Sequence, residues 1–134
     1  MKKSKKSSGP NAVAIIVDDD PAVRNSLKFF LEVEGLTVRT YANAAEALEE
    51  AHYPASGCLV IDYRLPGMTG LELLALLRER RIALPAILIT TNPSAYLVSR
   101  ARAAGVVLVE KPLLNEALHD AVQLAMNSPE QSRH

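Results

Sequence analysis

Five side chains with complementary chemistry stand at the ends of apolar runs in this sequence. Asp18 and Asp19 follow AVAIIV, Asp62 ends GCLVID, Thr90 ends LPAILIT, and Lys111 follows VVLVE. Carboxylates that lie close together raise one another's pKa unless a cation intervenes, and their hard oxygen atoms favour Mg²⁺. A lysine ammonium and a threonine hydroxyl can both bind phosphoryl oxygens. The set therefore suits phosphoryl transfer, with Asp62 as the nucleophile.

Each of these residues also has a purely structural interpretation. Asp20 precedes a proline and fits a helix cap better than a ligand, and the pair Asp18–Asp19 could cap the same helix. Thr90 could simply end a strand, and Lys111 could be a solvated surface lysine. Only their coincidence at the ends of several strands favours a functional site.

The elements that must position these residues alternate along the chain. Five apolar or alternating runs predict strands at 12–17, 36–41, 57–62, 84–90 and 106–110. Helical patterns separate them, and a Pro-Gly turn is expected at Pro66 and Gly67. The first four helices are expected to begin at Asp20, Asn43, Thr69 and Asn92. The first, second and fourth of them are expected to end near Gly35, His52 and Ala104, respectively. The last helix carries apolar residues at helical spacing, namely Leu118, Ala121, Val122 and Ala125.

This alternation predicts an α/β fold with a doubly wound parallel sheet, covered by helices on both faces. The continuous Val, Ile and Leu runs agree, because parallel strands are buried on both sides. In such sheets ligands bind at the carboxyl ends of the strands. The predicted strands deliver the five polar residues to that edge.

Composition limits the remaining possibilities. The 134 residues, 49% of them hydrophobic, suit one domain at 12–127, with a basic tail at 1–11 and a polar tail or linker start at 128–134. Four of the 15 basic residues lie in the first six positions, so the rest of the chain carries 11 basic and 15 acidic residues. We therefore expect no direct nucleic-acid binding. No apolar run approaches the ~20 residues of a membrane span, and the lone Cys58 fits a buried thiol in a reducing cytoplasm.

Four motifs then resemble the response-regulator receiver domains of bacterial two-component signalling. They are IIVDDDPAVR (15–24), IDYRLPGMTG (61–70), PAILIT (85–90) and VEKP (109–112), and the resemblance covers roughly residues 12–126. It implies a flavodoxin-like (βα)5 fold with five parallel strands in the order 2-1-3-4-5. It also implies that the domain is a signalling switch rather than an enzyme.

The resemblance further implies a role for each residue of the site. Asp62 would accept a phosphoryl group from a histidine kinase or histidine phosphotransfer protein. Asp18, Asp19, Asp62 and the backbone carbonyl of Arg64 would hold Mg²⁺. Thr90 and Lys111 would bind the phosphoryl oxygens. A homodimer through the fourth helix, fifth strand and fifth helix would be compatible with this family, and the chain could be a stand-alone regulator or part of a longer one.

Two departures from the family pattern leave an alternative open. Thr91 stands where the family usually has Ala or Gly, and Leu108 stands where it usually has an aromatic residue that takes part in switching. The chain could therefore be a pseudo-receiver, a binding module that acts without phosphorylation. A haloacid-dehalogenase-like phosphatase is a third possibility, but Ala22 occupies a position where that pattern needs Thr or Val.

Overall fold

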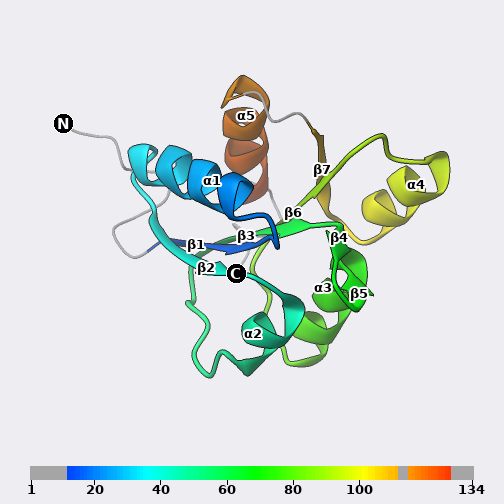
Figure 1. The fold of residues 1–134 in the computed structure, drawn as a ribbon, viewed down its shortest axis with the longest axis horizontal. Coiled ribbons are helices and arrows are strands. Elements are labelled where there is room, and N and C mark those ends of the chain that lie inside the picture. Colours follow the sequence, from blue (N-terminus) through cyan, green and yellow to red (C-terminus); the bar gives the residue numbers. More distant parts are fainter. Residues whose placement is uncertain (1–11, 112–114, 128–134) are drawn as a thin grey trace.

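The computed structural model describes residues 12–111 and 115–127, and its centre is one five-stranded parallel sheet (Figure 1). The strand order is β2-β1-β3-β6-β7, and every neighbouring pair is parallel. Since β4 and β5 form a separate small hairpin, this is the predicted order 2-1-3-4-5. The bounds are β1 Val13–Val17, β2 Thr37–Tyr41, β3 Gly57–Asp62, β6 Ala86–Thr90 and β7 Val107–Glu110.

Helices cover both faces of the sheet, as predicted (Figure 1). One face packs against α1 (Pro21–Val33) and α5 (Asn115–Met126), and the other against α2 (Ala44–Glu49), α3 (Gly70–Glu79) and α4 (Ala95–Ala103). Alternate residues of each central strand enter the two cores because successive side chains of a strand point to opposite faces. The strands β1, β3 and β6 are buried along their whole length, which is typical of parallel sheets.

The predicted helix starts are confirmed at three positions. The Asp20 carboxylate accepts a hydrogen bond from the Ala22 N–H at 2.9 Å, and proline follows as the first helical residue. Asn43 caps α2, and Thr69 and Glu72 form a reciprocal capping box on α3. These short-range bonds depend on neighbouring residues alone, which is why the sequence pattern predicts them.

The prediction that Asn92 and the proline after it open the fourth helix is wrong. Ser94 is the N-cap of α4, and its hydroxyl accepts a hydrogen bond from the Leu97 N–H at 3.0 Å. Asn92 instead adopts a left-handed backbone conformation with φ of 51°, which asparagine tolerates better than most residues. The connection from β6 to α4 therefore takes two residues more than the pattern indicated.

Other element bounds also differ from the prediction. The second helix ends at Glu49 rather than near His52, because Glu50 has an extended backbone. The strand expected from 84 begins at Ala86. The Pro-Gly turn closes a hairpin that was not predicted, in which β4 (Arg64–Leu65) pairs with β5 (Met68–Thr69). The tails expected at 1–11 and 128–134 lie outside the described residues.

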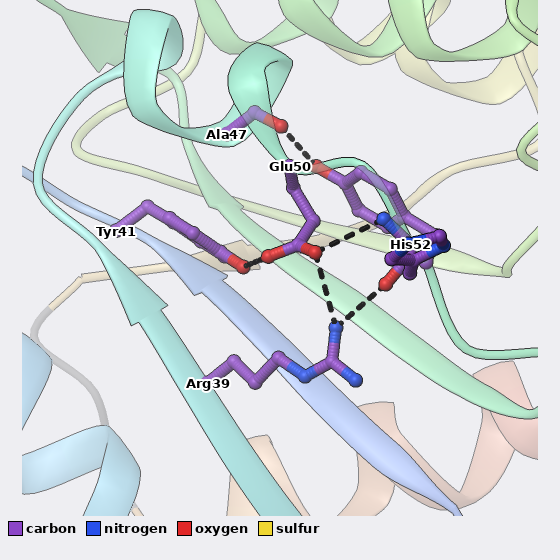
Figure 2. A network of polar contacts seen from close by, with 6 residues as sticks. Arg39, Tyr41, Ala47, Glu50 and His52 are labelled. Carbon is purple, nitrogen blue, oxygen red and sulfur yellow. Dashed lines mark hydrogen bonds and ion pairs between the residues drawn. The ribbon is translucent and has the colours of Figure 1, made fainter.

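A polar network joins the edge strand β2 to the segment after α2, on the face of the sheet that α2 covers (Figure 2). The Tyr41 hydroxyl donates to the Glu50 carboxylate, which also accepts from the His52 N–H at 3.0 Å. Arg39 donates to the His52 carbonyl at 2.8 Å and lies 3.8 Å from Glu50. The network therefore fastens the chain after α2 to β2, and Tyr53 adds a bond to the Ala47 carbonyl at 2.6 Å.

Candidate functional site

Three carboxylates meet at the carboxyl edge of the sheet. Asp18 and Asp19 follow β1, and Asp62 is the last residue of the neighbouring strand β3. Each of them offers a carboxylate oxygen that lies within 4.8 Å of the others, so the group could hold a metal ion. The structure thus brings together the three acids that the sequence placed at neighbouring strand ends.

Burial disfavours the ionised form of the carboxyl groups in this cluster. Asp18 is 1% exposed and Asp62 is 6% exposed, whereas Asp19 lies on the surface. Desolvation raises the pKa of both buried carboxyl groups, and the neighbouring acids add to the effect. One carboxylate oxygen of Asp18, Oδ2, is buried and has no hydrogen-bond partner among the residues that the structure describes. A buried acceptor without a donor is what a hard divalent cation would satisfy, so the residues present fit such an ion.

Lys111 places a positive charge beside the central acid. Its Nζ lies 3.4 Å from Oδ1 of Asp62, and this ammonium opposes the rise in the pKa of Asp62. The backbone N–H of Lys111 donates to the Thr90 carbonyl at 2.7 Å, which holds the ends of β7 and β6 together. Thr90 itself is buried at the end of β6. All the polar residues predicted for the site therefore stand at one edge of the sheet.

Helix α3 packs tightly behind the central acid through Gly70. A Cβ atom at this position would lie 2.6 Å from the Asp62 carbonyl oxygen and 2.8 Å from the Leu88 side chain. The Gly70 N–H also donates to the Tyr63 carbonyl at 2.7 Å. Only glycine allows so close an approach of the helix to the strand. Arg64, whose backbone carbonyl was predicted as a metal ligand, lies in the small hairpin that connects β3 to α3.

Two supporting residues were missed by the sequence reasoning. Arg24 of α1 donates from Nη1 to the Asp18 carbonyl at 2.8 Å, and the Asp18 N–H donates to the Tyr41 carbonyl at 3.1 Å. Both contacts fix the backbone that carries the first acid. The only signal for Arg24 was its place one turn into the helix that follows the acids, and Tyr41 gave none.

Comparison with known proteins identifies this arrangement. A family model described as the response regulator receiver domain matches residues 14–123. The chain belongs to the response-regulator receiver family. Asp18, Asp19, Asp62, Thr90 and Lys111 all lie within the matched range, which falls inside the domain expected at 12–127.

Individual relatives agree with this assignment. The chain is 38% identical over 120 residues to the transcriptional regulatory protein FixJ of Azorhizobium caulinodans, covering 88% of this chain and 57% of FixJ. The crystal structure of FixJ-N superposes with a TM-score of 0.78 at 34% identity, covering 88% of this chain and 95% of that one. A structure of the response regulator StyR gives 0.81 at 33% identity, with 92% and 63% covered. The chain spans little more than half the length of the FixJ relative.

Within the described ranges, no helix combines the length and the apolar character needed to cross a bilayer. Among those residues, the acidic cluster stands beside a lysine at the carboxyl edge of the sheet. This arrangement is suited to binding a cation together with an anionic group.

Proposed function

We propose that Asp62 is the phosphoacceptor of this receiver domain. The observation that carries the proposal is the buried Asp62 carboxylate, flanked by Lys111 at 3.4 Å and by two further acids. Its oxygen would attack the phosphorus of a phosphohistidine on a histidine kinase or phosphotransfer protein. The new P–O bond replaces the P–N bond, and the released imidazole takes up a proton. The product is an aspartyl phosphate.

The other residues of the site would bind and neutralise charge. Asp18, Asp19, Asp62 and the Arg64 backbone carbonyl would hold Mg²⁺, which supplies neutralisation of the phosphoryl oxygens when bound. Lys111 would pair with a second phosphoryl oxygen, and the Thr90 hydroxyl would donate to a third. Phosphoryl transfer needs little more than such positioning and electrostatic stabilisation. The domain would thus be a switch whose only chemistry is its own Mg²⁺-dependent phosphorylation and dephosphorylation.

Phosphorylation would act on partners through the surface of α4, β7 and α5. Thr90 precedes the connection to α4, and Lys111 follows β7, so both phosphoryl-binding residues border this surface. Tyr96 on α4 and Leu124 on α5 are more than half exposed there. A contact between two copies through these elements would give a homodimer.

The buried Cys58 thiol suits a reducing cytoplasm.

Incubation with acetyl phosphate and Mg²⁺ tests the proposed function. The intact protein should gain the mass of one phosphoryl group, and a chelator should prevent the gain. Asp62→Asn should gain nothing, because the amide is not a nucleophile of this kind. A mass gain that is equal in the variant would contradict the assignment of Asp62.

A pseudo-receiver remains the second candidate because of two observations. Leu108 is partly buried and packs against the core on the face of α2, α3 and α4, where it provides no aromatic ring for switching. Thr91 places a branched, exposed side chain directly after Thr90. Partner affinity measured with and without beryllofluoride separates the two candidates: a large change supports the phosphoacceptor switch, and an unchanged affinity supports the pseudo-receiver.

A further inference from the structure

A groove of about 300 Å³ lies between α3 and α4. Its α3 side consists of Leu71, Leu74, Ala75 and Arg78, which are spaced as one helical stripe. Its α4 side consists of Arg100 and the two alanines at 103 and 104. The groove runs from the first turn of α3 toward the carboxyl ends of both helices. It therefore leads away from the sheet edge that carries the acids.

The two arginines of this α3–α4 groove have no acidic partner in the described part of the chain. Arg78 donates from Nη1 to the Ile82 carbonyl at 2.7 Å. Arg100 donates from Nη1 to the Tyr96 hydroxyl at 2.7 Å, with its guanidinium 5.6 Å from the ring centre. Neither arginine forms an ion pair with any residue that the structure describes. The ion pairs of that part of the chain lie elsewhere, at Lys28–Glu32, Arg39–Glu50, Lys111–Asp62 and His119–Glu34.

The residues that line the groove include two arginines and no acidic residue, although the chain as a whole is neutral. Helix α4 contains two arginines and no acidic residue. The groove thus combines an apolar floor of leucines and alanines with a basic rim, and both arginines have N–H groups left to donate.

We propose that the α3–α4 groove binds an acidic amphipathic helix of a partner protein. Such a helix would place a stripe of apolar side chains on Leu71, Leu74 and the alanines, and its carboxylates would meet Arg78 and Arg100. Grooves with apolar floors commonly receive helices in this way. Arginine also binds carboxylates through two parallel hydrogen bonds, which gives direction as well as attraction.

The same observations disfavour nucleic acid and membranes as the occupant. Nucleic-acid binding relies on many phosphate contacts or on stacked aromatic residues, and the groove lining has two arginines and no aromatic side chain. An anionic membrane attracts clusters of basic residues on an outer surface, whereas these two flank a hollow between helices. An apolar floor is best covered by apolar side chains.

A synthetic peptide of about four helical turns tests the proposal on the unphosphorylated protein. It carries leucines every third or fourth residue, with glutamates on both sides of the stripe, and a fluorescent label. Titration should shift the amide resonances of Ala75, Ala103 and Ala104, and salt should weaken binding. A matched peptide with lysine in place of glutamate should not bind. Since no phosphorylation is involved, the result is independent of the role of Asp62.

Variants with matched charge changes make the test specific. Arg78→Gln and Arg100→Gln should each weaken peptide binding by up to roughly five-fold, the range for an exposed ion pair. Arg102→Gln removes the same charge from α4 outside the groove lining and should change it much less. Ala75→Leu should block binding by filling the groove without altering charge. Equal effects of all three arginine variants, unshifted groove resonances, or tighter binding of a DNA duplex or anionic vesicles at these residues would overturn the proposal.

Discussion

Ionised carboxylates are costly to bury, and this domain buries two of them side by side. Burial raises the pKa of Asp18 and of Asp62, and the ammonium of Lys111 opposes this rise. A raised pKa means that the folded state binds these protons more tightly than the unfolded chain does. The resulting stability is present below the unfolded pKa and is lost as the pH rises through the folded value. At neutral pH these two groups therefore lower the free energy of unfolding of the metal-free domain, compared with a pH below their pKa in the unfolded chain.

Replacing Asp18 by asparagine should remove part of this cost. We expect Asp18→Asn to raise the free energy of unfolding of the metal-free protein at neutral pH, because the amide carries no charge to desolvate. The same change should abolish the stabilisation that Mg²⁺ gives to the unaltered protein, because a ligand is lost. Urea unfolding followed by circular dichroism, with and without Mg²⁺, measures both effects. Asp20→Asn, which keeps a good helix cap, is the control, and a destabilised Asp18→Asn protein would refute the account.

At the scale of elements, two contacts hold the site in place: α3 packs against β3, and the edge strand β2 is joined to the segment after α2. The first depends on Gly70 and the second on the network around Tyr41 (Figure 2). Helix caps such as Thr69 could be predicted because they depend on nearby residues alone. These two contacts could not, since they join residues brought together only by the finished sheet.

Gly70→Ala should disturb the site through its backbone. Helix propensity alone predicts that alanine is favoured over glycine inside a helix by about 1 kcal/mol. A Cβ atom 2.6 Å from the Asp62 carbonyl oxygen should reverse that sign and destabilise the domain by roughly 1–3 kcal/mol. Phosphorylation by acetyl phosphate should slow as well. Thermal unfolding and the rate of mass gain measure the two effects, and a more stable variant would show that the helix can move without penalty.

Tyr41→Phe should loosen the attachment of β2. Loss of the hydrogen bond to Glu50 should lower the free energy of unfolding by about 1 kcal/mol. Burial and this bond raise the pKa of Tyr41 to about 12, so its contribution is present below pH ~10 and is lost as the pH rises toward 12. Alkaline titration of the phenol absorbance, compared between the two proteins, measures the shift. Tyr96→Phe, an exposed change on α4, should leave stability nearly unaltered, and equal losses in both variants would contradict the role of the network.

For the molecule as a whole, hydrophobic patterning predicted the parallel sheet and the edge that carries the acids, and the resemblance to receiver domains supplied the strand order. Strand runs such as 57–62 are buried on both faces, and their length and composition already indicate this. The choice of Ser94 over Asn92 as a cap was not predictable, because both residue types cap helices and the path of the loop decides between them. The burial of Asp18 and the exposure of Asp19 were not predictable either, and the same holds for the groove between α3 and α4. Each of these features depends on how the helices pack on the finished sheet.

Cys58 reports on the integrity of this whole core. It lies fully buried in β3, and burial raises the pKa of its thiol to about 12. Because only the thiolate reacts rapidly, labelling requires the sheet to open. We expect a thiol reagent to label the native protein many orders of magnitude more slowly than the urea-unfolded protein. Rapid labelling in native buffer would show that the central strand is accessible and that the core is not as tightly closed as described.

Locating the phosphoryl group decides whether Asp62 is the phosphoacceptor. After incubation with acetyl phosphate and Mg²⁺, borohydride reduction of an aspartyl phosphate leaves homoserine at the modified position, which peptide mass spectrometry can assign. We predict homoserine at position 62 in the unaltered protein and none in Asp62→Asn. Modification at Asp18 or Asp19, or no modified aspartate in a folded, Mg²⁺-bound protein, would contradict it.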